Sequence, residues 1–423
     1  MRRVRQCCLF IALAGLAAAV FGLTLSRASV WQPGAVVAAV GLAIGLGAVT
    51  PLRGYQYTAW ILAAVVAAMI FPAAFLRWGD LDLRHPWMVL AVVQLVMFGM
   101  GTQMSLRDFV GVMKMPWGVV VAVVCQFFIM PLSGFALIHV FTLPPEIAAG
   151  VILIGSCSSG LASNVMCYIA RANLALSITA TAMTTLLAPL MTPLWMKLLA
   201  GELVEVSFLR LMAEIIKIVL VPIAAALLHD QLPSLGRGGR RVVYLLAAVG
   251  AAFIASLVFG GWGWVERNTG PVTGLFVQLI AVGFGAILFG LLYHTLATRV
   301  SALQRTMPVL SMAGIVYFTT VTTAAGRDHL LMVGGVLMMV AVLHNSAGYF
   351  FGYWMARACR LDIPSARAVA IEVGLQNGGM ASGLAGAMGK LATVGLASAV
   401  FSPWMNISGS ILANYWRKRP AKS

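Results

Sequence analysis

The chain alternates long apolar stretches with short polar segments. None of the stretches alternates apolar and polar residues with a period of two, as the strand of an outer-membrane barrel would. Each is close to the 20 or so residues that a helix needs to cross a hydrocarbon core about 30 Å thick. The fourteen predicted spans are 7–26, 31–50, 57–76, 87–104, 117–140, 146–169, 174–199, 207–229, 242–262, 273–296, 307–324, 329–355, 365–388 and 394–416. This pattern predicts an all-α polytopic membrane protein.

Composition supports the same class. Of the 423 residues, 61% are hydrophobic and only 9% are charged, whereas a soluble domain is about one-quarter charged. So apolar a chain is not a soluble enzyme, a nucleic-acid-binding protein or a disordered protein. Its six cysteines lack metal-ligand spacing. We therefore expect the lipid bilayer as its main partner and no nucleic acid.

The basic residues predict the orientation. Lys and Arg number 28 against 12 Asp and Glu. With a cytoplasmic N-terminus and alternating spans, about two-thirds of the cations fall in inner loops, as the positive-inside rule requires. This predicts a multi-pass protein of a bacterial inner membrane with both termini cytoplasmic. The first segment also has the basic start of a signal peptide, but its cleavage site is poor, so we expect a retained helix.

Two spans contain residues that weaken helices. Residues 155–164 read Gly-Ser-Cys-Ser-Ser-Gly-Leu-Ala-Ser-Asn, and residues 371–383 read Ile-Glu-Val-Gly-Leu-Gln-Asn-Gly-Gly-Met-Ala-Ser-Gly. A broken helix in a bilayer is tolerated only where protein, water or a ligand satisfies its backbone. Paired interruptions in two halves of a chain indicate a transporter binding site.

The surroundings of the two interruptions also correspond. Residues 158–163 resemble 377–382, and the Pro-containing residues 188–192 resemble 402–406. The preceding spans each carry polar residues, Gln126 in one and His344-Asn345 in the other. An odd number of spans separates the halves, which predicts an inverted repeat with two crossing discontinuous helices. The alternative is chance similarity among apolar helices.

Glu372 is the one carboxylate deep in an interrupted span, where an unpaired charge costs several kcal/mol. Oxygen ligands suit a hard cation such as Na⁺, whereas thiolate or imidazole would indicate a transition metal. Two alternatives stay open: Glu372 as a hydrogen-bonded clasp between helices, or as a proton carrier. The neutral oxygen-bearing neighbours are Gln126, Ser163, Asn164, Ser177, Thr181, Gln376 and Asn377.

Two further charges lie within a span. Glu214 and Lys217 are three residues apart and share a helix face, which predicts a mutual ion pair or two side chains reaching the interface. Binding of an anionic substrate by Lys217 is the alternative.

Residues 90–229 and 302–418 contain seven motifs in a fixed order. They are Phe98-Gly99-Met100-Gly101, Gln126-Phe127-Phe128-Ile129-Met130-Pro131, Ala162-Ser163-Asn164, Ala175-Leu176-Ser177, Leu187-Ala188-Pro189, Ile371-Glu372-Val373-Gly374-Leu375-Gln376-Asn377 and Asn406-Ile407-Ser408-Gly409-Ser410. Together these motifs resemble the bile acid:sodium symporter family, whose members transport organic anions together with Na⁺. The resemblance implies two inverted five-helix repeats, in which a panel domain packs against a core domain containing two broken helices that cross.

The resemblance also implies two sodium sites and a substrate site. Asn377 and Asn406 would face the substrate, beside half-helix N-termini that favour an anion. The first sodium site would comprise Ser163, Asn164, Ser177, Thr181 and Glu372. The second would comprise Gln126, Glu372, Gln376 and the backbone carbonyls of Val373 and Leu375.

The chain departs from the family pattern in two ways. Leu161 replaces a hydroxyl residue and Met405 replaces a histidine, which makes the substrate site less polar. Four predicted spans also have no counterpart. We therefore divide the chain into an additional N-terminal pair (1–56), a first inverted repeat (57–200), a second inverted repeat (207–229 and 302–418) and an inserted pair (242–296).

These features predict sodium-coupled symport of a small organic anion, either bile-acid-like or a small carboxylate, with two Na⁺ ions. One alternative is a proton-coupled or efflux transporter of the same fold that uses Glu372 as its titrating group. A more distant one is a membrane sensor that does not transport. No catalytic constellation shares a span, so we do not expect an enzyme.

Overall fold

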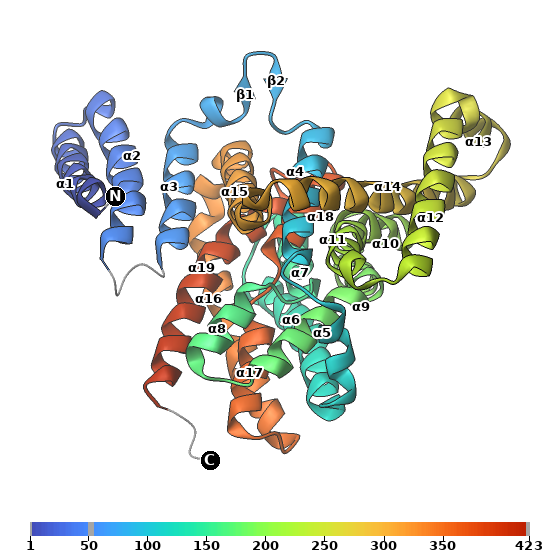
Figure 1. Ribbon diagram of the computed structural model, residues 1–423. Helices are drawn as coiled ribbons and strands as arrows, with labels where there is room; N and C mark the ends of the chain where they lie inside the picture. The colour runs from blue at the N-terminus through green and yellow to red at the C-terminus, as the bar shows by residue number, and fades with distance from the viewer. Residues whose placement is uncertain (1, 50–54, 420–423) are drawn as a thin grey trace.

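The computed structural model describes residues 2–49 and 55–419, so the end of the predicted span 31–50 and part of the 1–56 unit lie outside it. The described chain is helical apart from one antiparallel ribbon, β1 (Arg77–Trp78) with β2 (Leu81–Asp82) (Figure 1). Its α-helices are α1 (Arg2–Thr24), α2 (Ala28–Gly45), α3 (Gln56–Ile70), α4 (Pro86–Gly101), α5 (Leu106–Val110), α6 (Pro116–Val140), α7 (Pro145–Ser156), α8 (Ala162–Ala170), α9 (Leu174–Ala200), α10 (Phe208–Ile215), α11 (Val221–Gln231), α12 (Arg237–Ser256), α13 (Trp262–Asn268), α14 (Pro271–Arg299), α15 (Ser301–Ala325), α16 (Arg327–Ala358), α17 (Ile363–Gly374), α18 (Gly378–Ala387) and α19 (Val394–Arg417).

Every predicted span coincides with a helix or a pair of helices. Within the described residues, nine helices are long and apolar enough to cross a membrane, or up to ten if α4 and the helix after it, bent by 67°, form one span. Other predicted spans fall short because they are broken or brief, such as the 15-residue α3. The protein is therefore an integral multi-pass membrane protein, and the total of fourteen spans stays a prediction.

Both predicted interruptions are present. The first apolar segment ends as α7 at Ser156 and resumes as α8 at Ala162. The second ends as α17 at Gly374 and resumes as α18 at Gly378. Serine, asparagine and glycine favour caps and turns over helix interiors, which explains why the helices stop there.

The broken helices lie at the centre of the molecule. Helix α7 is buried at every position from 147 to 156. It packs against α6, α9 and α19, while α17 packs against α16, α6 and α9. Helices α3, α4, α11 and α15 form a neighbouring group, in which α4 contacts α11, α15 and the broken-helix segment α18. Polar groups at the breaks are thereby enclosed by apolar side chains of the main buried cluster.

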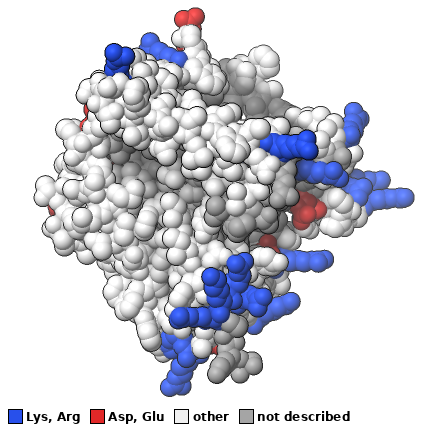
Figure 2. Space-filling model, turned by 90° about the vertical axis from the view of Figure 1, so that its left-hand side faces the viewer, with Lys and Arg blue, Asp and Glu red and all other residues white. Residues whose placement is uncertain are grey.

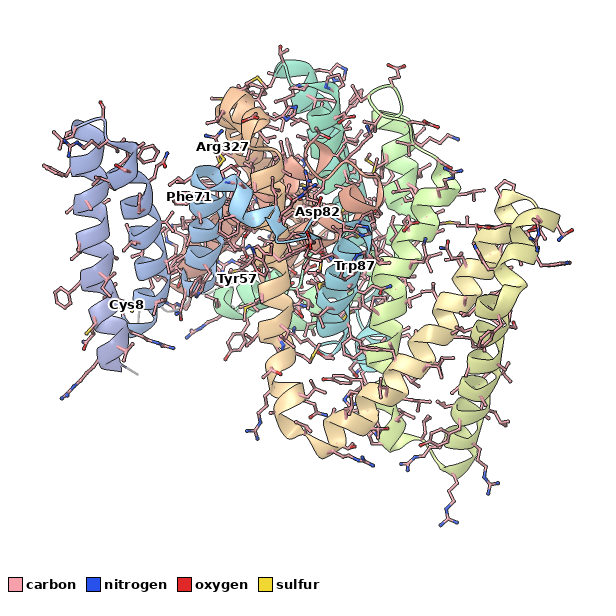
Figure 3. The ribbon with its side chains drawn as sticks, turned by 90° about the horizontal axis from the view of Figure 1, so that it is seen from above. Cys8, Tyr57, Phe71, Asp82, Trp87 and Arg327 are labelled. Atoms are coloured by element: carbon pink, nitrogen blue, oxygen red, sulfur yellow. The ribbon has the colours of Figure 1, made fainter. Side chains whose placement is uncertain are left out.

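Two peripheral units flank this centre. The α1–α2 hairpin lies at one side in Figure 1, and α12, α13 and α14 project from the opposite side. Only 11% of the apolar windows of the spans containing α12 and α14 is buried in the protein. Figure 3 shows Cys8 on the hairpin, apart from the other labelled residues, Tyr57, Phe71, Asp82, Trp87 and Arg327. Such exposed apolar helices are suited to contact with lipid.

The surface and the short ribbon fit this setting. Figure 2 shows a broad uncharged face, with Lys and Arg gathered toward the lower end and the right-hand edge.

An ion pair lies at the end of the ribbon. Arg84, two residues after β2, donates to Asp82 from Nε at 3.0 Å and from Nη2 at 2.8 Å. These hydrogen bonds lower the pKa of Asp82 to about 2. Asp82 therefore stays charged at neutral pH, outside the apolar region.

The contact between α7 and α19 requires a glycine. A Cβ on Gly150 would lie 2.2 Å from the carbonyl oxygen of Val394. We therefore expect Gly150→Ala to destabilise the protein by about 1–3 kcal/mol, because the two backbones must separate. Thermal unfolding of the purified protein measures this as a lower Tm. Gly283→Ala in α14 is the matched control, since a Cβ there meets nothing within 4 Å; an equal Tm for the two variants would contradict the close packing.

Candidate ion and substrate site

The two broken helices meet backbone to backbone. Ser159 and Gln376 form an isolated antiparallel bridge. The Gly160 amide donates to the Leu375 carbonyl at 2.8 Å, and the Asn377 amide donates to the Ser158 carbonyl at 2.9 Å. Each interruption thus satisfies backbone groups of the other, which is what a broken helix inside a bilayer needs.

Side-chain amides satisfy the ends of the first half-helices. Nε2 of Gln126 in α6 donates to the Cys157 carbonyl, just after α7, at 2.9 Å. Nδ2 of Asn345 in α16 donates to the Gly374 carbonyl, at the end of α17, at 2.6 Å. The helix that precedes each broken helix therefore supplies a side-chain amide to a carbonyl at the end of its first half in both halves of the chain.

Glu372 lies beside this crossing and is only 2% exposed. Its Oε1 accepts hydrogen bonds from Ser163 at 2.6 Å and from Ser177. Its Oε2 accepts from Ser159 at 2.5 Å and from Thr181 at 2.9 Å. The hydroxyls come from the first interruption, α8 and α9, whereas Glu372 comes from α17, so the carboxylate joins the two halves of the chain.

The carboxylate is stabilised by neutral donors. Among the described residues, the salt bridges involve other acidic groups, and none reaches Glu372. Asn164 adds a further oxygen, since its Oδ1 lies 2.8 Å from the Ser177 hydroxyl oxygen and 3.4 Å from that of Thr181. The cluster therefore has one negative charge and several neutral oxygens, a donor set that suits a hard monovalent cation.

The other predicted ion ligands lie next to the crossing. Gln126 donates from Nε2 to Oε1 of Gln376 at 2.6 Å, and Gln376 donates from its own Nε2 to the Val373 carbonyl at 2.6 Å. The Leu375 carbonyl accepts from Gly160. Oε1 of Gln126 is buried without a hydrogen-bond partner in the described structure. An unpartnered buried oxygen of this kind is available to a cation.

The four predicted substrate-site residues have different environments. Asn377 caps α18 by accepting from the Met380 amide at 3.0 Å, and its Nδ2 is buried without a partner in the described structure. Asn406 is half-buried and donates to the Ser402 carbonyl at 2.8 Å. Met405 is buried, and its sulfur accepts from the Gln376 amide at 3.4 Å. Leu161 is half-buried, immediately before α8.

Sequence reasoning missed Ser159 as a partner of Glu372. It also missed Thr184, whose hydroxyl lies 3.2 Å from that of Ser159. The position of Ser159 within the interruption could have indicated its contact with Glu372. That prediction also required the register in which the two interruptions pair, which places Ser159 opposite Gln376.

The predicted ion pair between Glu214 and Lys217 is confirmed. Nζ of Lys217 lies 2.5 Å from Oε1 of Glu214. Lys217 is buried in a π-helical turn, Ile216–Leu220, between α10 and α11. The pair therefore neutralises a lysine inside the apolar part of the protein.

Removing the Ser159 hydroxyl tests its role at Glu372. Ser159→Ala takes one donor from a buried carboxylate, and hydrogen bonds to charged groups contribute about 1.5–3 kcal/mol. We expect a clearly lower Tm in sodium-free buffer. Ser311→Ala is the control, because that buried hydroxyl bonds a neutral backbone carbonyl, of Met307, at 3.1 Å. Equal losses in the two variants would contradict a special contribution of Ser159.

The chain is similar in sequence to known proteins. The profile of the Sodium Bile acid symporter family matches residues 90–266. The "Uncharacterized sodium-dependent transporter YocS" of Bacillus subtilis (strain 168) is 32% identical over 378 residues, which cover 88% of this chain and 94% of that protein. The "Probable sodium/metabolite cotransporter BASS1, chloroplastic" of Arabidopsis thaliana is 29% identical over 363 residues, covering 86% and 73%.

A human protein is also similar. The ileal sodium/bile acid cotransporter of Homo sapiens is 27% identical over 286 residues, covering 68% of this chain and 65% of its own length. All three relatives are named as transporters, and none as an enzyme. The chain belongs to the sodium bile acid symporter family and is a transport protein rather than an enzyme.

Proposed function

We propose that this protein is a secondary active transporter that carries a small organic anion across the membrane together with Na⁺. The observation that supports this most strongly is the buried carboxylate of Glu372, surrounded by four hydroxyls where the two broken helices cross. Two relatives, named a sodium-dependent transporter and a sodium/bile acid cotransporter, support the same coupling ion.

The first sodium ion would bind at Glu372. The oxygens already converge there, and each hydroxyl that donates its proton to the carboxylate keeps lone pairs for a cation. A sodium ion at this position would compensate the one buried negative charge. The proposed ligands are Ser163, Asn164, Ser177, Thr181 and Glu372.

The second sodium ion would bind near the glutamine pair. The unpartnered Oε1 of Gln126 is the main support, because a buried acceptor lacks a donor there. Backbone carbonyls have two lone pairs, so they can ligate an ion while keeping their present hydrogen bonds. The proposed ligands are Gln126, Glu372, Gln376 and the carbonyls of Val373 and Leu375.

The organic anion would bind beside Asn377 and Asn406. The free Nδ2 of Asn377 is a buried donor without an acceptor, and a carboxylate would satisfy it. Helix α18 starts directly after Asn377, so its N-terminal dipole favours negative charge there. Leu161 and Met405 make the surroundings apolar, which favours a less polar anion of the bile-acid type over a small hydroxy acid.

Coupling follows from the shared crossing. A sodium ion at Glu372 would tie α8 and α9 to α17, and so would stabilise the same crossing that presents Asn377. Each ligand then raises the affinity for the other by the same factor. Two sodium ions with a monovalent anion carry one net positive charge inward. The membrane potential would drive that charge with about 2.3 kcal/mol per 100 mV.

The chain organisation is part of the proposal. Residues 57–200 would form the first inverted repeat, and residues 207–229 with 302–418 the second. The matching roles of Gln126 and Asn345 support this division. Residues 1–56 and 242–296 would be added helix pairs, although the family match extends to residue 266 and so covers α12. The distribution of cations supports both termini in the cytoplasm of a bacterial inner membrane.

Uptake into proteoliposomes tests the proposal. We expect an inward sodium gradient to drive uptake of cholate, and Glu372→Gln to reduce sodium-driven flux at least tenfold, because the variant removes the charge that compensates the cation. Asp328→Asn is the control, since Asp328 is an exposed acid outside the crossing.

Three results would contradict this proposal in different ways. Uptake that is independent of the sodium gradient but rises steeply with a proton gradient would favour proton coupling through Glu372. Unchanged sodium-driven flux in Glu372→Gln would remove Glu372 from the mechanism. Saturable binding of cholate with no flux under any gradient would favour a sensor.

A further inference from the structure

A cavity lies away from the crossing of the two broken helices. Its volume is about 540 Å³, and it lies between α10, α14 and the end of α18. Its lining includes Arg210, Leu211 and Glu214 of α10, together with Ser207 just before that helix. These positions recur every three or four residues, so one face of α10 forms the cavity wall.

The other walls come from distant parts of the chain. Leu275 and Gln278 of α14 form one side, and Met388 and Lys390 after α18 form another. Gln278 is also anchored to the π-helical turn that follows α10, since its Oε1 accepts from Nζ of Lys217 at 3.3 Å. Helix α14, although otherwise peripheral, is therefore held in place at this cavity.

The cavity is physically separate from the proposed ion sites. Helix α18 starts after Asn377 at the crossing and ends at Ala387 on the cavity wall. With 10 residues, it spans about 15 Å. A molecule in the cavity is therefore about one short helix away from the Asn377 side chain.

Two of the four charged residues that line the cavity are paired. Lys390 is paired with Glu146, and Glu214 with Lys217 at 2.5 Å. Arg210 is exposed and forms no ion pair in the part of the chain that the structure describes. A guanidinium on a cavity wall suits a carboxylate, which it can hold by two parallel hydrogen bonds.

The remaining wall combines apolar side chains with the polar Ser207 and Gln278 and one further acid. Leu211, Leu275 and Met388 supply hydrocarbon surface, and the volume is in the range of small-molecule sites. Glu205 also lines the cavity, is exposed and forms no ion pair in the described chain. Its negative charge would oppose a bound anion, so its removal should strengthen binding.

We propose that this cavity is a separate binding site for an organic anion with an apolar body, in which Arg210 binds the carboxylate and α14 provides a specificity-determining wall. This proposal rests on the proposed function, because it takes the anion bound in the cavity to be the transported anion. The site lies at the far end of α18, which starts directly after Asn377, so an anion bound there lies about one short helix from the crossing.

Equilibrium binding of radiolabelled cholate to the purified full-length protein tests this, in sodium-free buffer and below micellar concentrations. We expect saturable binding, which Arg210→Gln weakens about tenfold through loss of the charged hydrogen bonds. Arg210→Lys should weaken it less, because the charge remains. Glu205→Gln should strengthen it. Arg267→Gln on the neighbouring α13 should leave it unchanged, since Arg267 is exposed but does not line the cavity.

The probe itself supplies the remaining control. Cholamide, the neutral amide of cholate, should bind the wild type and Arg210→Gln equally well. The proposal is overturned if the wild type shows no saturable cholate binding, if Arg210→Gln and Arg267→Gln weaken binding equally, or if Glu205→Gln weakens it. Arg210-dependent binding in a protein with no sodium-driven uptake would instead support the site and contradict the proposed function alone.

Discussion

Inside a bilayer, a backbone that leaves the helical conformation must find hydrogen-bond partners within the protein. Here the two interruptions find them in each other, through Gly160 with Leu375 and Asn377 with Ser158. This pairing fixes where the two halves of the chain meet. It also places the ends of four short helices, with their unsatisfied backbone groups, at one buried point. Ion and substrate sites follow from that concentration of polar groups.

The contact between the two halves of the chain at the crossing is also made through the carboxylate of Glu372. Its four donors come from one half of the chain and the carboxylate from the other, so the site is complete only when the halves are packed together. Neutral hydroxyls stabilise the charge without cancelling it. A cation that supplies the missing charge would therefore strengthen the contact between halves, which is the physical basis proposed here for coupling sodium to the organic anion.

Much of the crossing could be predicted from sequence, because its polar and helix-weakening residues differ from the apolar residues of the spans around them. Glycine, serine and asparagine in apolar spans predicted both interruptions, and the isolated Glu372 predicted a polar cluster. The contact between Ser159 and Glu372 could not be predicted, since it depends on the register in which the interruptions pair. Helix ends were less predictable: the span expected over 57–76 contains the α-helix α3, which ends at Ile70. The cavity at Arg210 depends on how α14 packs against α10, which apolar periodicity does not specify.

The most direct test of the central claim is equilibrium binding of radioactive sodium to the purified protein. The account predicts saturable binding of two ions per chain that potassium does not displace, with the ion at Glu372 lost in Glu372→Gln and retained in Asp328→Asn. Absence of saturable sodium binding to the wild type, or identical binding to Glu372→Gln, would contradict it.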